Sequence, residues 1–137
     1  MYLLDTNVVS ELRRAKKADP RVRAWAQTLP AANLYLSVIS MLELEMGVLL
    51  IERRDRKQGR ILRAWMDGHV LSTFAGRVLA IDTAVALRCA ALHVPDPRSD
   101  RDALIAATAI VHGMTVVTRN VSDFQPMGIT VVNPWQP

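Results

Sequence analysis

The sequence has little cysteine and no long hydrophobic run, and both shortages exclude classes of protein. One cysteine, Cys89, in 137 residues allows no internal disulfide framework and no cysteine-based zinc site, and it favours a reducing compartment. The longest apolar stretch, residues 103–117, is interrupted by His112 and Gly113 and is shorter than the ~20 residues of a membrane-spanning helix. The start of the chain lacks the basic and apolar regions of a signal peptide. We therefore expect a cytoplasmic protein without a membrane segment.

The motifs of several common enzyme classes are also missing. The sequence contains no G-x-x-x-x-G-K phosphate loop, no dinucleotide fingerprint and no G-x-S-x-G nucleophile elbow, which removes the usual support for nucleotide hydrolysis and acyl transfer. Its three histidines are widely separated, so a histidine zinc site is not expected. No lysine follows Lys57, which argues against a phosphoryl-accepting regulatory domain, because such a domain needs a lysine beside its acids.

The composition is that of one soluble globular domain. Half of the residues are hydrophobic and 22% are charged. A chain of this length can bury roughly two thirds of its unfolded surface, so it can form a core without disulfides or a structural metal. No repeat, linker or low-complexity tract divides it. We expect a single domain over residues 1–137, with a helical hairpin at about residues 40–75.

Positive charge is concentrated in two segments. Residues 13–23 hold six cations and one acid, and residues 52–63 hold six cations and two acids. The two segments together carry a charge of +9, so the rest of the chain carries −5 and the whole chain +4. Two basic segments on an acidic body suit a polyanion held by its phosphates near an acidic centre, although a charge run on a helix is often only a solvated face. The residues that we expect to contact a phosphate backbone are Arg53, Arg54, Arg56, Lys57 and Arg60.

Short apolar runs alternate with stretches of helical periodicity. The expected strands cover residues 2–4, 34–38, 78–81, 115–118 and 129–132, and the expected helices cover 6–12, 20–29, the hairpin, 83–93 and 103–112. Ser40 and Glu43 match a capping box at the start of the hairpin, Gly59 marks a turn or weak point within it, and Gly113 is placed to end the last helix. This alternation predicts an α/β three-layer sandwich, with a central, mainly parallel five-stranded sheet flanked by helices.

Four acids follow the predicted strands. Asp5 comes directly after the first strand and Glu43 lies one turn into the helix after the second. Asp102 starts an apolar helix, and Asp123 lies in a polar loop after the fourth strand. Ligands bind beyond the carboxyl ends of parallel strands, so all four can face one crevice. Clustered carboxylates repel one another unless a cation neutralises them, which makes Mg²⁺ or Mn²⁺ the expected species.

Each acid also has an ordinary structural explanation. Asp5 can cap the helix that begins at Thr6, and Glu43 can complete the capping box with Ser40. Asp102 can stabilise a helix start through the helix dipole, and Asp123 can simply form a turn. None of the four is diagnostic alone.

Four segments in this order resemble the PIN-domain ribonucleases, and more narrowly the VapC-type toxins of bacterial toxin–antitoxin pairs. The segments are Leu3–Asn7, Ser37–Leu44, Asp102–Ala109 and Thr118–Phe124, and the resemblance spans nearly the whole chain. The ending Asn133-Pro134-Trp135 is similar to the plasmid-stability branch of that family. Each motif is weak alone, but four in the same order in a chain of this length are specific.

The resemblance implies a PIN fold with an acidic pocket that holds Mg²⁺ or Mn²⁺. The metal-binding and catalytic residues would be Asp5, Glu43, Asp102 and Asp123, with Asn7 and Thr118 as supporting polar groups. It also implies cleavage of RNA, a homodimer that can join a larger toxin–antitoxin assembly, and inhibition by a cognate antitoxin.

Both lines of reasoning predict a metal-dependent endoribonuclease. A metal-activated water would attack an RNA phosphodiester in line, with Asp5 and Asp102 as the principal ligands. Glu43 would act through a water or position the nucleophile, and Asp123 would complete the negative pocket. The rival prediction is a PIN-fold module that binds RNA or an antitoxin but has lost catalysis.

Overall fold

Five short parallel strands form the centre of the structure, a computed structural model that describes residues 1–137. The strands are β1 (Tyr2–Leu4), β2 (Leu34–Ser37), β3 (Val78–Leu79), β4 (Thr115–Val117) and β5 (Val131–Val132). They lie in the order β3-β2-β1-β4-β5, and every neighbouring pair is parallel. All carboxyl ends therefore lie along one edge of the sheet, which we call the carboxyl edge. The predicted mainly parallel five-stranded sheet is confirmed.

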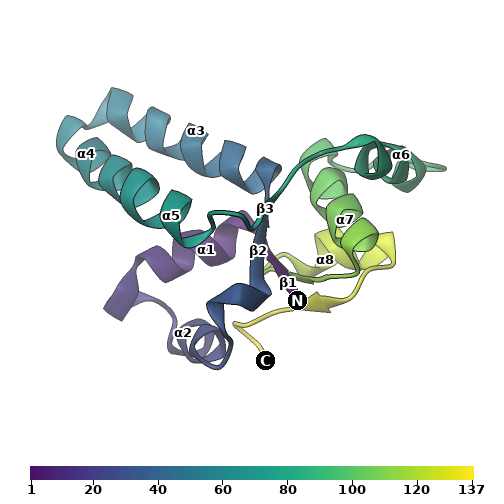
Figure 1. The fold of residues 1–137 in the computed structure, drawn as a ribbon, viewed down its shortest axis with the longest axis horizontal. Coiled ribbons are helices and arrows are strands. Elements are labelled where there is room, and N and C mark those ends of the chain that lie inside the picture. Colours follow the sequence, from purple (N-terminus) through teal and green to yellow (C-terminus); the bar gives the residue numbers. More distant parts are fainter.

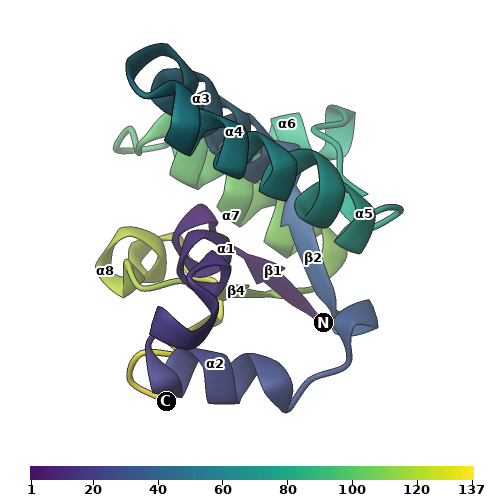
Figure 2. The same ribbon diagram turned by 90° about the vertical axis from the view of Figure 1, so that its left-hand side faces the viewer.

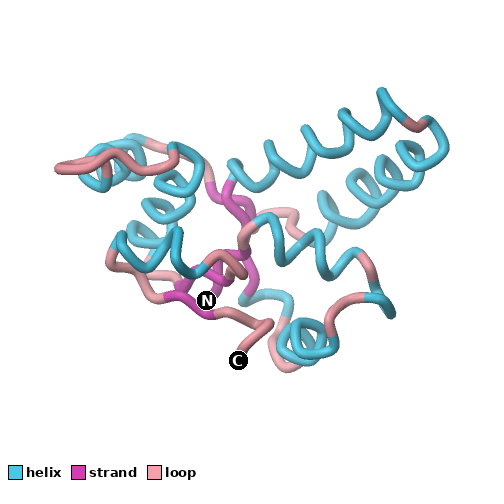
Figure 3. The backbone as a smooth tube through the Cα atoms, turned by 180° about the vertical axis from the view of Figure 1, so that it is seen from behind, coloured by secondary structure: helices cyan, strands magenta, loops and turns pink.

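Helices cover both faces of this sheet, which confirms the sandwich (Figure 1). On one face lie α1 (Thr6–Arg13), α2 (Pro20–Gln27), α3 (Val38–Arg54), α4 (Arg56–Trp65) and the short α5 (Leu71–Thr73). On the other lie α6 (Thr83–Leu92), α7 (Asp100–His112) and α8 (Val121–Phe124). Seen from behind, the strands lie between these two groups of helices (Figure 3). None of these helices combines the length and the hydrophobicity that a membrane span requires.

Side-chain alternation along the strands builds a separate core on each face. Leu3 and Val116 pack with α6, α7 and α8, whereas the next residues, Leu4 and Val117, pack with α1, α3 and the turn after α4. All four are essentially inaccessible to solvent. Because successive residues of a strand point to opposite faces, a strand of three residues can supply both cores and still deliver the residue after it to the carboxyl edge.

Most of the predicted helix boundaries are present. Pro20 begins α2 behind an Asp19 cap, Asp82 caps α6 by accepting from the N–H of Val85, and Gly113 ends α7 in the left-handed region at φ 66°. The proposed capping box is wrong. The helix begins at Val38, three residues earlier than the box requires, because Ser37 accepts a hydrogen bond from the N–H of Ile39 and serves as the cap.

The hairpin of α3 and α4 extends away from the sheet on one side of the molecule (Figure 1). Its turn is at Asp55, which caps α4 by accepting from the N–H of Gln58. The predicted turn or weak point at Gly59 is wrong, since Gly59 lies buried inside α4. A Cβ there would stand 2.6 Å from Cα of Glu52, so glycine is required for the close approach of the two helices. Arg63 of α4 then joins Glu45 and Glu52 of α3 at 2.7 and 3.0 Å.

Candidate metal centre at the carboxyl edge

Asp5 stands at the centre of the carboxyl edge, directly after β1. Its backbone N–H still donates to the carbonyl of Val117, 2.9 Å away, which extends the pairing of β1 with β4 by one residue. Its side chain is 6% exposed, and Oδ1 accepts from the N–H of Thr6 at 2.9 Å, so Asp5 does cap α1. The cap uses only Oδ1. Oδ2 points into the polar network described next, so the structural role and the predicted site role are compatible.

Thr118 and Asn7 orient the second oxygen of Asp5. The Thr118 hydroxyl donates to Oδ2 at 2.7 Å and the amide of Asn7 donates to the same oxygen at 3.3 Å. Thr118 is fully buried, and its Oγ1 also accepts from the N–H of Asn120. The side-chain oxygen of Asn7 accepts from the N–H of Arg119 at 3.3 Å. The two predicted supporting residues therefore connect β1, α1 and the loop after β4 at this carboxylate.

Glu43 faces the same edge from the second turn of α3. Its Oε1 accepts from the hydroxyl of Thr6 at 2.7 Å, which joins α3 to the first turn of α1. Its Oε2 lies 3.6 Å from the guanidinium of Arg101, which is half exposed. Ser40, the supposed capping partner of Glu43, is instead fully buried and donates to the carbonyl of Leu4. Glu43 is therefore free of the helix cap and belongs to the edge.

Asp102 approaches from the first turn of α7 and has the most perturbed carboxyl group of the chain. Burial is the largest cause that raises the pKa of Asp102, to about 6. The negative charges of three nearby carboxylates raise this pKa further; in decreasing order they belong to Asp5, Asp123 and Glu43. The neighbouring Asp100 is exposed and lies 3.6 Å from His93, so it is turned away from the edge.

The pKa of Asp5 is raised as well, first because the carboxyl is buried. The hydrogen bonds from Thr118 and Thr6 act against this rise, and the charges of Glu43 and Asp123 add to it. Burial therefore outweighs the two hydrogen bonds that stabilise the charged carboxylate, and the neighbouring negative charges act in the same direction as burial. The four predicted acids thus lie within electrostatic reach of one another, from four different elements.

Asp123 completes the set from α8, and it is exposed. It lies in a short helix rather than the predicted loop, because the chain turns helical at Val121 and places buried Phe124 against the core. Helix geometry then fixes the neighbouring Asp123 beside the edge. The negative charge of Asp123 contributes to the raised pKa values of both Asp5 and Asp102.

The donor set fits a hard divalent cation in its chemistry. All donors are carboxylate oxygens, which Mg²⁺ and Mn²⁺ prefer, and Arg101 is the one cation that contacts any of the four acids. An added positive charge would offset the repulsion among these carboxylates, which adds to the effect of burial on the pKa values of Asp5 and Asp102. No three of these side chains lie close enough together to hold a metal ion without moving.

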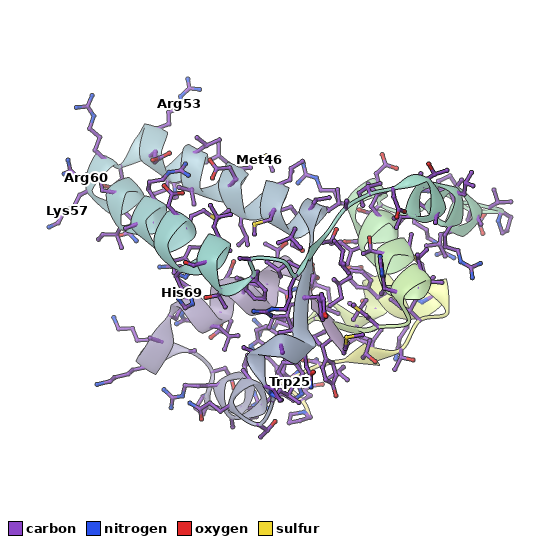
Figure 4. The ribbon with its side chains drawn as sticks, in the orientation of Figure 1. Trp25, Met46, Arg53, Lys57, Arg60 and His69 are labelled. Atoms are coloured by element: carbon purple, nitrogen blue, oxygen red, sulfur yellow. The ribbon has the colours of Figure 1, made fainter.

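The basic residues predicted to contact a phosphate backbone lie elsewhere. Arg53, Lys57 and Arg60 point outward from the free end of the α3–α4 hairpin (Figure 4). These residues, with Arg54 and Arg56, are exposed and make no ion pair. Arg63 of the same segment is neutralised by Glu45 and Glu52. The hairpin end is remote from the acids, so the structure does not bring this predicted group to the carboxyl edge.

A groove of about 200 Å³ instead runs from the acids along α1 and α3. It is lined by Arg13, which belongs to the basic segment at residues 13–23. Thr6 and Glu43 form its acidic end, and Arg13 and Trp65 line it farther along, with the Arg13 guanidinium 5.9 Å from the indole centre. Sequence reasoning did not single out Arg13 or Arg101 for the site. Arg101 precedes Asp102 on a helix start, which is the signal that points to it.

Comparison with known proteins gives one consistent result. The PIN domain family matches residues 2–125. The chain is 38% identical to VapC ribonuclease Y4jK of Sinorhizobium fredii, over the whole chain and 99% of that protein. It is 36% identical to plasmid stability protein StbB of Pseudomonas syringae pv. tomato, over 99% of both chains. The crystal structure of FitAcB from Neisseria gonorrhoeae superposes with a TM-score of 0.91, at 37% identity over all of both chains.

Proposed function

The chain belongs to the PIN-domain family, and we propose that it is a Mg²⁺- or Mn²⁺-dependent endoribonuclease that acts as the toxin of a toxin–antitoxin pair. Similar proteins named as a VapC ribonuclease and as toxin FitB, the latter 38% identical over 98% of this chain, support both parts of the proposal. The observation that carries it is the convergence of Asp5, Glu43, Asp102 and Asp123 on the carboxyl edge.

Asp5 and Asp102 would hold the metal ion, because their carboxyl groups are partly or fully buried at the edge and both also experience the negative charges of Glu43 and Asp123. When bound, the ion supplies a Lewis acid that lowers the pKa of a water and stabilises charge on a phosphate oxygen. Glu43 would act through a water or position the nucleophile. Asp123, which is exposed, would close the negative pocket toward solvent.

This chain's own residues prepare the site for that chemistry. Thr118 and Asn7 hold Oδ2 of Asp5 in one orientation, and the Thr6 hydroxyl does the same for Glu43. Fixed carboxylates do not need to reorganise when charge develops on the phosphate, which lowers the barrier. In-line attack of water on the phosphodiester would leave a 5′-phosphate and a 3′-hydroxyl.

RNA would enter along a partly basic surface. Arg53, Arg54, Arg56, Lys57 and Arg60 would contact the backbone of a long RNA at the hairpin end, and Arg13 lies nearer to the acids. Backbone contacts of this kind position an RNA without choosing its sequence.

A cognate antitoxin would inhibit the enzyme, and we propose a homodimer that assembles further with it. The structures of FitAB bound to a DNA fragment and of a toxin–antitoxin complex from Klebsiella pneumoniae support the antitoxin partner, with TM-scores of 0.90 and 0.69 at 38% and 26% identity. They cover 98% of this chain. The hairpin also exposes apolar side chains that a partner chain would cover. They are Leu42, Met46, Leu49, Leu50 and Ile61.

An end-labelled RNA assay on antitoxin-free protein tests the proposal. Wild-type protein is incubated with Mg²⁺, Mn²⁺ or EDTA, and the product ends are identified by their need for a phosphatase or kinase. Cleavage that requires the divalent ion and leaves 5′-phosphates is expected. A folded protein that binds RNA and Mn²⁺ but cuts no RNA at any metal concentration is instead the inactive binding module.

A further inference from the structure

A second concave region opens beside the carboxyl edge, and none of its residues belongs to the acidic set. It has a volume of about 430 Å³ and lies between the first turn of α2, the start of α8 and the C-terminal segment. Figure 2 shows that segment running between α8 and α2. The residues that matter below are Arg21, Arg119, Ser122, Asn133 and Trp135, and we call the region the arginine cavity.

Arg119 links the arginine cavity to the acids. It directly follows Thr118, whose hydroxyl is bonded to Asp5, and its own N–H donates to Asn7. Its backbone is therefore fixed by the same network that orients the Asp5 carboxylate, while its side chain lines the cavity. The arginine cavity and the acidic edge are therefore joined through the consecutive residues Thr118 and Arg119.

Trp135 holds the Arg119 guanidinium in place. The guanidinium carbon lies 5.3 Å from the centre of the indole, and Trp135 is 6% exposed, so the ring is a fixed platform. The backbone N–H of Trp135 donates to the side-chain oxygen of Asn133 at 2.9 Å. That bond leaves the amide nitrogen of Asn133 as a donor toward a ligand. An arginine stacked on one face keeps the donors at its rim available for a phosphate.

The charge of the arginine cavity is opposite to that of the edge. Arg119 has no carboxylate partner, and Arg21 forms a salt bridge with Asp19 at 3.2 Å. No acid lines the cavity. The hydroxyl of Ser122 adds a further polar group. Two guanidiniums with neutral polar neighbours form a site for an anion that also carries hydroxyl groups.

We propose that the arginine cavity binds a phosphate and ribose of the RNA strand, adjacent to the phosphodiester held at the acids. The proposal rests on the proposed ribonuclease function and names a subsite of it. A strand with one phosphate at a negative edge gains from a cation under the neighbouring phosphate, and Arg119 is the cation that the backbone fixes there. The volume of about 430 Å³ falls within the range typical of small-molecule sites. The 2′-hydroxyl, which distinguishes RNA, would meet Ser122 or Asn133.

The test compares Arg119→Gln and Arg21→Gln with wild type in Mn²⁺-dependent cleavage of short single-stranded RNAs. Arg88→Gln is the matched control, because Arg88 is exposed on α6, makes no ion pair and loses the same charge. Arg119→Gln should raise KM about 10-fold with little change in kcat, since a phosphate contact contributes mainly to binding. The slope of log(kcat/KM) against log[salt] should become shallower by about 0.7, the value for one lost contact to a single strand. Arg21→Gln should show a smaller loss, because Asp19 already shares its charge.

Substrate length separates a subsite from a structural role. The RNA is shortened one nucleotide at a time from each end. The Arg119→Gln defect should vanish when nucleotides are removed from one side only, because the phosphate that Arg119 contacts is then gone. A defect that is equal on long and minimal substrates, or an unchanged KM and salt slope on long RNA, overturns the subsite while the ribonuclease function stands.

Other outcomes are equally decisive. Wild-type protein that neither cleaves nor binds RNA overturns both the proposed function and this subsite. A poly-glutamate peptide whose binding requires Arg119, with RNA cleavage unaffected by Arg119→Gln, assigns the arginine cavity to an acidic protein partner and overturns the RNA proposal.

Discussion

The hydroxyl of Thr118 donates a 2.7 Å hydrogen bond to Oδ2 of Asp5, although 113 residues separate the two along the chain. The bond joins the residue after β4 to the residue after β1, the two strands at the middle of the sheet. It is the contact through which the fold orients the proposed metal ligand.

Replacing Thr118 by Val keeps the shape and removes this donor. The buried Asp5 carboxylate then loses its best partner, so the free energy of unfolding should fall by about 1–3 kcal/mol, measured by urea denaturation. Mn²⁺ affinity, measured by calorimetry, should fall about 10–100-fold. Thr118→Ser should restore both, because it keeps the hydroxyl. Equal Mn²⁺ affinity for the Val and Ser variants would show that the bond does not orient a ligand.

The stability of the metal-free protein should depend on Asp102 with a definite sign. Its pKa rises from 3.8 to about 6 on folding, so its stabilising contribution is present below pH 3.8 and is lost as the pH rises through 6. Asp102→Asn is neutral throughout and should be more stable than wild type at pH 7 by about 1 kcal/mol, after allowance for solvent screening of a partly exposed group. Urea midpoints of both proteins at pH 4 to 7 in EDTA check this. A difference in urea midpoint between the two proteins that grows toward low pH would contradict a raised pKa of Asp102.

Mn²⁺ should stabilise the protein through the acids. Ligand at 100 times its dissociation constant adds about 2.7 kcal/mol to the free energy of unfolding, which a thermal shift detects. The Asp5→Asn substitution should abolish this thermal shift. In the wild-type protein the shift should become smaller below pH 6, because Asp102 then gains a proton. Asp96→Asn is the control, since Asp96 is an exposed loop residue. An equal shift in all three proteins would place Mn²⁺ elsewhere.

Two glycines of the hairpin should respond to alanine in opposite ways. A Cβ at Gly59 would lie 2.6 Å from the backbone of Glu52, so Gly59→Ala should destabilise the protein by about 1–3 kcal/mol. A Cβ at Gly47 meets nothing within 4 Å, so Gly47→Ala should stabilise α3 by about 0.5–1 kcal/mol. Thermal melts of the two variants measure the contrast. Equal effects would mean that the helices do not approach at Gly59.

Arg63 should stabilise the hairpin by neutralising two glutamates. Its hydrogen bonds hold the pKa of Glu45 and of Glu52 below their usual range, so its contribution is present at neutral pH and is lost as the pH falls through those lowered values. Arg63→Gln should therefore lower the urea midpoint at pH 7, less so in high salt. Arg53→Gln, which removes an unpaired cation, should leave the midpoint unchanged. A similar loss in both variants would point to helix propensity instead.

The sheet, and the position of four acids beside its carboxyl edge, can be predicted from the sequence because both follow local rules. A short apolar run followed by Asp or a capped helix marks the end of a strand, and parallel strands bring such ends to one edge. Local rules fail where a tertiary contact overrides a motif. Ser40 and Glu43 fit a capping box, yet burial of Ser40 against Leu4 and the bond of Glu43 to Thr6 determine their positions.

Gly59 and the basic segment show the same limit. Glycine is typical of turns, but at Gly59 the reason for glycine is a helix packed too close for a Cβ, which depends on α3. The cations near residue 60 look like one patch in the sequence. Only the fold shows that Arg63 is neutralised and that the others lie far from the acids, while Arg13, Arg101 and Arg119 lie near them.

The rate of RNA cleavage by Asp5→Asn in saturating Mn²⁺, relative to wild type and to Asp96→Asn, tests the central claim most directly. Asn keeps the size of Asp5 and can still accept from the N–H of Thr6, so circular dichroism should show a folded protein. We predict that Asp5→Asn loses more than about 100-fold in rate while Asp96→Asn retains the wild-type rate. Cleavage by folded Asp5→Asn at the wild-type rate would contradict a metal-dependent site at the carboxyl edge.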